Sequence, residues 1–149
     1  MFKHILVPTD GSELSRAASD RAIQLAKFAG ARLTFLYAKP ERPVTFFGGE
    51  GGMFVDQASP EDFDELARKQ SETVLGEAME KAKAAGVDCH RVSQTGAAPY
   101  EVIIEVATAM NCDLILMASH GRTGVKAMIL GSETQKVLTH SKIPVLVYR

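Results

Sequence analysis

The residues best suited to chemistry lie in one glycine-containing loop near the carboxyl end of the chain. It reads Ala118-Ser119-His120-Gly121-Arg122-Thr123-Gly124, continues to Leu130, and closes with Gly131-Ser132-Glu133-Thr134. Glycines permit backbone angles and close approaches that a side chain would block. Ser132 and Gln135 have the spacing of a capping box, which predicts that a helix begins at Ser132. The free N–H groups of Ser132 to Thr134 would then bind an anion such as a phosphate.

Other side chains around this loop support two interpretations. Arg122 and Lys126 add cationic donors for a phosphate. On spacing alone, however, the glycines serve equally well as turn residues, with Gln135 closing a helix cap. His120 suits either donation to a phosphate oxygen or stabilisation of the turn. The remaining histidines show no metal-ligand spacing with one another or with Cys89 and Cys112, so we expect no metal site made only of protein ligands: His4, His90, His140.

A second polar loop, Pro8-Thr9-Asp10-Gly11-Ser12-Glu13, follows the apolar run Ile5–Val7. Asp10 and Glu13 have capping-box spacing, which predicts a role in starting the next helix. In open parallel sheets, ligands bind outside the carboxyl ends of strands, where the strand order reverses. Both loops follow predicted strands, so we expect them to share one edge of a sheet.

The elements that position these loops follow from hydrophobic periodicity. Short apolar runs predict strands: Ile5–Val7, Leu33–Ala38, a weaker one over Val87–Gln94, Asp113–Ala118 and Ile143–Tyr148. Helical spacing predicts helices between them: Glu13–Ala29 ended by Gly30, Pro60–Ala85 with Phe63 and Leu66 facing inward, one starting at Pro99, and Ser132–His140. Near-continuous apolar strands joined by helices predict the α/β class, an open, mainly parallel five-stranded sheet with helices on both faces. Residues 39–59 form a glycine-rich connection, either a functional flap or a disordered segment.

Length and charge restrict the class of protein. The 149 residues suffice for one domain over 1–149, and the net charge of −1 argues against a nucleic-acid partner and a cationic membrane anchor. No signal peptide or long apolar run is evident, so we expect a soluble, cytoplasmic protein without a membrane partner.

The whole chain resembles the universal stress protein family. The resemblance rests on four separated segments in the family's order: Ile5-Leu6-Val7-Pro8-Thr9-Asp10-Gly11-Ser12, Asp113 to Gly124, Leu130-Gly131-Ser132, and Ile143-Pro144-Val145-Leu146-Val147. It implies a Rossmann-like fold, similar to adenine nucleotide alpha-hydrolases. It also implies an adenine-nucleotide site with the pattern Gly-x2-Gly-x9-Gly-Ser/Thr. Gly121, Gly131 and Ser132 match that pattern, whereas Ala118 occupies the position of the first glycine.

The resemblance also implies roles for individual residues. Asp10 would lie near the ribose, the phosphates or a bound Mg²⁺, with Pro8 and Thr9 on the same wall, and Ala38 would contact adenine through its backbone. Glu133 places a carboxylate in the turn that should receive phosphate; outward orientation or a divalent cation would relieve the repulsion. The predicted nucleotide-binding set is Pro8, Thr9, Asp10, Ala38, Ala118, Ser119, His120, Gly121, Arg122, Thr123, Gly124, Gly131, Ser132, Glu133, Thr134.

The function implied is a stress-response regulator that binds ATP, or AMP or ADP, with Mg²⁺ carried by the phosphates. We expect no dedicated catalysis, since the chain lacks the common phosphate-loop and dinucleotide fingerprints. Slow ATP hydrolysis and a nucleotide-free member acting through protein contacts are the alternatives. The apolar strand Ile143–Tyr148 at a sheet edge, together with the resemblance, predicts a homodimer. Valine at Gly131 is expected to block the phosphates without disturbing the fold.

Overall fold

A computed structural model describes residues 1–41, 59–122 and 129–149. Strands and helices alternate along the chain in the predicted order: β1 (His4–Pro8), α1 (Glu13–Ala29), β2 (Arg32–Pro40), α2 (Pro60–Ala84), β3 (Cys89–Gly96), α3 (Pro99–Ala109), β4 (Leu114–Ala118), α4 (Ser132–His140) and β5 (Val145–Tyr148). Most of the predicted flap over residues 39–59 lies outside the described residues. Thr123, Gly124 and Lys126 also lie outside them.

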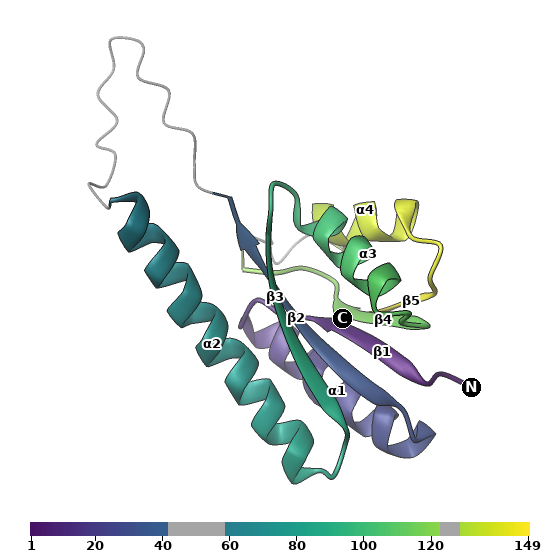
Figure 1. The fold of residues 1–149 in the computed structure, drawn as a ribbon. Helices are drawn as coiled ribbons and strands as arrows, with labels where there is room; N and C mark the ends of the chain where they lie inside the picture. Colours follow the sequence, from purple (N-terminus) through teal and green to yellow (C-terminus); the bar gives the residue numbers. More distant parts are fainter. Residues whose placement is uncertain (42–58, 123–128) are drawn as a thin grey trace.

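The five strands form one sheet in the order β3-β2-β1-β4-β5, and every neighbouring pair is parallel (Figure 1). The fold class predicted from the sequence is therefore confirmed. From the central strand β1, the chain adds β2 and β3 on one side and then returns to add β4 and β5 on the other. The strand order consequently reverses between β1 and β4, which is where open α/β sheets bind ligands.

Helices cover both faces of the sheet, and each face has its own apolar core (Figure 1). Helices α1 and α2 pack on one face, against strand residues such as Val7, Phe35 and Leu116. On the other face α3 and α4 pack against Leu36 and Ile115, among others. Successive side chains of a strand point to opposite faces, so strands buried on both sides must be apolar at nearly every position.

The helix starts confirm one sequence prediction and correct another. As expected, α2 begins at Pro60 and α1 ends at Gly30, which has a φ of 67°. Ser59 caps α2 by accepting from the Asp62 N–H. The predicted capping box of Asp10 with Glu13 is wrong, because Ser12 caps α1 by accepting from the Ser15 N–H.

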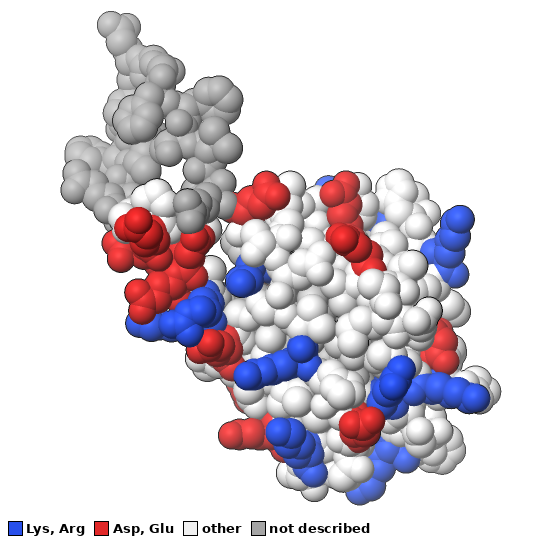
Figure 2. Space-filling view, in the orientation of Figure 1, with Lys and Arg blue, Asp and Glu red and all other residues white. Residues whose placement is uncertain are grey.

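Leu66, predicted to face inward, is 67% exposed. The buried residues of α2 begin only at Ser71, so the first turns of the helix, Leu66 included, have no part of the core to cover them. They carry Glu61 and Asp62, and elsewhere on the face drawn in Figure 2 acidic and basic side chains are interspersed.

Within residues 1–41, 59–122 and 129–149, no helix combines the length and apolarity that a membrane span requires.

Candidate functional site

A cavity of about 310 Å³ opens at the carboxyl edge of the sheet, where the strand order reverses. Its walls come from the ends of β1, β2 and β4, from α3, and from the start of α4. The lining residues are Pro8, Thr9, Asp10, Ser15, Leu36, Ala38, Pro99, Ile103, Met117, Ala118, His120, Gly121, Arg122, Gly131, Ser132, Glu133, Thr134. This volume lies at the lower end of the range for small-molecule sites.

One end of the cavity is apolar and carries a pair of backbone groups with no hydrogen-bond partner in the described part of the chain. Leu36, Ile103 and Met117 line it and continue the core beneath α3. Strand β1 stops at Pro8, opposite Leu36, and the Thr9 N–H donates to the Leu36 carbonyl at 2.8 Å. Because peptide groups alternate in direction along a strand, the N–H and C=O of Ala38 face the same side as those of Leu36, beyond the end of β1. They are thus positioned to pair with the edge of a flat polar ring.

At the other end, Asp10 joins the two polar loops that the sequence predicted to meet. Its Oδ1 accepts from the Ser12 N–H at 2.9 Å, and its Oδ2 accepts from the Arg122 N–H at 2.9 Å. A Cβ on Gly121 would collide with Asp10 Oδ2. Gly121 is therefore required for the close approach of the carboxylate to its backbone.

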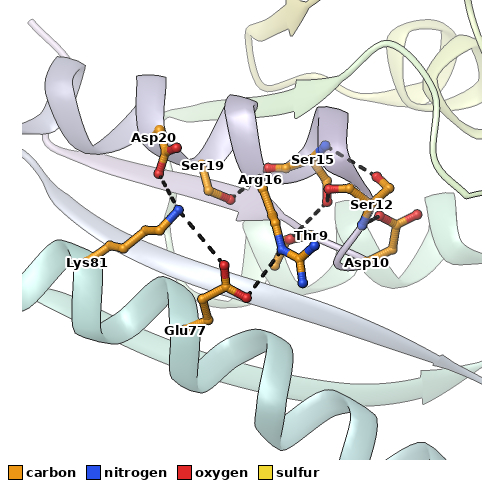
Figure 3. A network of polar contacts seen from close by, with 9 residues as sticks. All are labelled: Thr9, Asp10, Ser12, Ser15, Arg16, Ser19, Asp20, Glu77 and Lys81. Atoms are coloured by element: carbon orange, nitrogen blue, oxygen red, sulfur yellow. Dashed lines mark hydrogen bonds and ion pairs between the residues drawn. The ribbon is translucent and has the colours of Figure 1, made fainter.

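A short polar network holds the Asp10 loop on α1 (Figure 3). Thr9 Oγ1 lies 3.2 Å from Ser15 Oγ, whose hydroxyl donates to the Ser12 carbonyl at 3.0 Å. Farther along α1, Arg16 pairs with Glu77 of α2 at 3.2 Å. The loop is consequently fixed both to its own helix and, through that helix, to α2.

The surroundings of Asp10 keep it ionised. Burial alone would raise the pKa of this carboxyl. Hydrogen bonds from the side chain and N–H of Ser12, the N–H of Arg122 and the Ser15 side chain outweigh that effect and hold the pKa below its usual value. Asp10 therefore presents a fixed negative charge to the cavity at neutral pH.

We expect Asp10→Asn to destabilise the fold by about 1–3 kcal/mol at pH 7, because one backbone N–H would face an amide NH₂ instead of an acceptor. A lowered pKa in the folded state contributes stability above the unfolded-state pKa, and this is lost as pH falls through the folded-state value. The difference between wild type and variant should therefore shrink below about pH 4. Urea unfolding between pH 7 and pH 2.5 measures it.

Asp20→Asn is the matched control, since Asp20 is an exposed residue of α1 that pairs with Lys81 of α2 at 3.0 Å (Figure 3). Its cost should stay within about 1 kcal/mol. An equal loss of stability in the two variants would show that the hydrogen bonds of Asp10 do not stabilise the fold.

The start of α4 offers backbone donors without a side-chain acceptor. The helix begins at Ser132 as predicted, but its N-cap is Gly131 and no side chain caps it. The predicted capping box of Ser132 with Gln135 is wrong, because Gln135 Nε2 instead donates to the Leu130 carbonyl at 3.3 Å. The first N–H groups of a helix have no partner within it, so those of Ser132, Glu133 and Thr134 remain available.

Two contacts fix this helix start to the end of β4. The Gly131 N–H donates to the Ser119 carbonyl at 2.6 Å, and Thr134 Oγ1 donates to the Ala118 carbonyl at 3.1 Å. A Cβ on Gly131 would lie 3.2 Å from both Ser119 O and His120 Cα. Valine at Gly131 would thus require the backbone of the neighbouring loop to shift slightly, and the expectation that it leaves the fold undisturbed stays a prediction.

Glu133 turns away from its own helix start. Its Oε2 accepts from the Tyr100 N–H at 2.8 Å, in the first turn of α3, whose N-cap Ala98 provides no side-chain acceptor. The side chain thereby caps α3 from α4. The carboxylate nevertheless stays on the wall of the cavity, because Glu133 is among its lining residues, so a phosphate bound at α4 would still experience its charge.

Arg122 lines the cavity, but its guanidinium extends to α2. There Nη1 and Nη2 donate to the side-chain oxygen of Gln70. A Cβ on Gly11 would lie 3.0 Å from Arg122 Nη2, so the arginine side chain crosses the loop after β1. The sequence predicted this charge beside the phosphates, whereas in the structure the guanidinium reaches α2.

Ala118 stands where the family pattern has glycine, and its position accommodates the added Cβ. Among the described residues, Asn111 is the one non-glycine residue with a positive φ, so Ala118 has an ordinary backbone conformation. Its side chain packs in the core beneath α1, on the face opposite Leu36 and Met117. The Cβ that replaces a hydrogen is therefore directed away from the apolar end of the cavity.

The predicted site residues fall into three groups. The cavity wall contains Pro8, Thr9, Asp10, Ala38, Ala118, His120, Gly121, Arg122, Gly131, Ser132, Glu133, Thr134. Ser119 is buried behind that wall, with its Oγ 3.2 Å from His120 Nδ1, and Thr123 and Gly124 lie outside the described residues. Sequence reasoning missed Ser15, Leu36, Pro99, Ile103 and Met117. Leu36 could have been found, because it precedes Ala38 by two positions on one strand and so shares its face.

No group of three or more His, Cys, Asp or Glu side chains that could hold a metal ion occurs in the described part of the chain. A divalent cation at this edge would have to share its coordination with a ligand. Of the described acidic residues, Asp10 and Glu133 line the cavity.

Comparisons with known proteins agree over the whole chain. The family model for the universal stress protein family matches residues 1–149. Universal stress protein YxiE of Bacillus subtilis is 34% identical over 149 residues, which cover 100% of each chain.

Solved structures share the fold of this chain. A universal stress protein family member from Burkholderia pseudomallei has a TM-score of 0.77 at 24% identity, covering 99% of this chain and 96% of that one. A universal stress protein in complex with cAMP has a TM-score of 0.71 at 29% identity, covering 99% and 97% of the two chains. The chain therefore belongs to the universal stress protein family.

Proposed function

We propose that this protein binds an adenine nucleotide in the cavity between β1 and β4 and acts as a regulator whose state depends on that ligand. The observation that carries the proposal is the match between the two ends of one cavity and the two ends of a nucleotide. The solved relative in complex with cAMP, 29% identical to this chain, supports the ligand class.

The apolar end suits a purine base. Adenine has a donor and an acceptor on adjacent positions of one edge, which is the pattern that the N–H and C=O of Ala38 can pair with. Leu36, Ile103 and Met117 would contact its faces, where burial of apolar surface favours binding. A base lacking that donor–acceptor order is expected to bind less tightly.

The polar end suits phosphate. The starts of α1 and α3 are capped by Ser12 and Glu133, whereas the N–H groups at the start of α4 have no side-chain acceptor. An anion bound there would gain hydrogen bonds and the favourable end of the helix dipole. Mg²⁺ would accompany ATP, with the ionised Asp10 directed toward it. We propose binding without dedicated catalysis, in the cytoplasm.

The experiment is extraction of nucleotide from the purified protein, with mass spectrometry and then calorimetric titration of the emptied protein with AMP, ADP, and ATP plus Mg²⁺. We expect an adenine nucleotide in the extract and saturable binding at one site per chain. An empty protein with no heat from any of them would favour the nucleotide-free alternative. Release of ADP on standing with ATP would favour slow hydrolysis.

We further propose a homodimer formed through β5. This strand ends the sheet order, so its outer edge has no strand partner within the described residues, and Leu146 on it is 41% exposed. Apolar edge strands readily pair with another chain.

Leu146→Lys is expected to convert a micromolar dimer into a monomer, because the substitution would bury a charge between two copies. Sedimentation equilibrium measures the mass. Leu66→Lys on α2, where the leucine is 67% exposed, is the control and should remain dimeric. A monomeric wild type, or a dimer that survives Leu146→Lys, would contradict an interface on β5.

A further inference from the structure

The charged side chains that line the described part of the cavity are not those of a site for highly charged anions. Asp10 and Glu133 contribute carboxylates, and Arg122 is the one Lys or Arg among the lining residues. The Arg122 guanidinium, however, donates to Gln70 of α2. Among the described lining residues, carboxylate charge therefore prevails near the start of α4.

Glu133 is held in place by two neighbours, Tyr100 and Lys136. Its Oε2 accepts from the Tyr100 N–H at 2.8 Å, and Lys136 Nζ lies 3.4 Å from its Oε1. Lys136 in turn lies 5.4 Å from the centre of the Tyr100 ring, which stacks at 5.5 Å on His140. The Glu133 side chain is only 35% exposed. Its carboxylate is thus fixed on the cavity wall between the starts of α3 and α4, close to the backbone N–H groups of α4 that have no side-chain acceptor.

We propose that Glu133 selects nucleotides by the charge of their phosphates, so that the cavity favours a nucleoside monophosphate over a triphosphate unless a divalent cation accompanies the triphosphate. This inference rests on the proposed adenine-nucleotide function. The first phosphate is stabilised by the start of α4. Each additional phosphate charge is repelled by a carboxylate that cannot turn away, and a divalent cation bound to the phosphates reduces that repulsion.

A purely structural role for Glu133, as the cap of α3, makes a different prediction. Glu133→Gln separates the two roles because the glutamine side-chain oxygen can still accept from the Tyr100 N–H, so the cap is kept while the charge is lost. If Glu133 only caps α3, the ratio of AMP to ATP affinity would not change in this variant.

Glu101→Gln is the matched control. Glu101 also lies at the start of α3, where its Oε1 accepts from the Tyr100 hydroxyl at 3.0 Å, but it does not line the cavity. The two variants therefore remove the same charge from the same neighbourhood. Glu133→Gln removes a charge on the cavity wall, whereas Glu101→Gln removes a charge outside the cavity.

The test is calorimetric titration of wild type, Glu133→Gln and Glu101→Gln with AMP and ATP at low ionic strength, in EDTA and in excess Mg²⁺. In EDTA, wild type should bind AMP about tenfold more tightly than ATP. Glu133→Gln should raise the ATP affinity about threefold to tenfold and leave AMP nearly unchanged. Glu101→Gln should behave as wild type, and Mg²⁺ should reduce the wild-type difference.

Two results would overturn the selection by Glu133 while leaving nucleotide binding intact. One is a ratio of AMP to ATP affinity that is the same in wild type and Glu133→Gln, and the other is tighter binding of ATP than of AMP in EDTA. Absence of binding by either nucleotide in every condition would instead overturn the proposed function itself, and this inference with it. Thermal unfolding of the three proteins checks that the α3 cap is preserved. A much lower melting temperature in Glu133→Gln alone would indicate that the cap was lost, and the structural role would then prevail.

Discussion

Gly121→Ala is expected to lower adenine-nucleotide affinity by about tenfold to a hundredfold. The added Cβ would collide with Asp10 Oδ2, so the carboxylate must move and give up its 2.9 Å hydrogen bond from the Arg122 N–H. A hydrogen bond to a charged group contributes about 1.5–3 kcal/mol, and 1.4 kcal/mol corresponds to a tenfold change in affinity. Because that bond joins the loops after β1 and β4, its loss would open the phosphate end of the cavity.

Calorimetric titration with AMP measures this effect, and Gly76→Ala is its control. A Cβ on Gly76, inside α2, would meet nothing within 4 Å. That variant should bind AMP as wild type does and be equally or more stable, since alanine favours helix more than glycine. Equal AMP affinity in Gly121→Ala and wild type would show that the Asp10 contact does not shape the site.

Phe35→Ala is expected to reduce the free energy of unfolding by about 3–5 kcal/mol. Phe35 is among the largest side chains that are fully buried, and it lies on β2 beneath α1 and α2. Its removal leaves a cavity between the sheet and both helices, because closely packed interiors collapse only partly around a deletion. Since domains of this size have about 5–15 kcal/mol of stability, the loss is a large share of the total.

The urea midpoint measures this loss, with Phe28→Ala as the control. Phe28, near the end of α1, is 93% exposed, so its truncation should change stability by no more than about 0.5 kcal/mol. A similar change in the two variants would contradict the assignment of Phe35 to the core beneath α1 and α2.

The alternation of strands and helices was predictable because single residues mark where a helix starts or ends. Gly30 ends α1 with a positive φ, and Pro60 with its Ser59 cap starts α2. Those signals depend on local backbone chemistry, and the structure confirms them. Where the core begins to cover α2 depends on how the helix packs on the sheet, not on the helix alone, and for this reason Leu66 was wrongly placed in the core.

The partners of the polar side chains were not predictable from local spacing. Asp10 and Glu133 each had a plausible role near its own position in the chain, yet Asp10 accepts from Arg122 and Glu133 from Tyr100. Both contacts link segments more than thirty residues apart, and they exist because the parallel sheet brings loop ends to one edge. Arg122 likewise reaches Gln70 of α2, a contact that no motif encodes.

The most direct test of the central claim is an amide-resolved NMR titration of ¹⁵N-labelled protein with AMP. The claim that the base pairs at β2 and the phosphate binds at the start of α4 predicts saturable shifts of the amides of Ala38 and Ser132 to Thr134 with one shared Kd. Shifts that saturate only at the opposite edge of the sheet, around Gly30 and Gly86, would contradict it, as would the absence of any shift at Ala38 and Ser132.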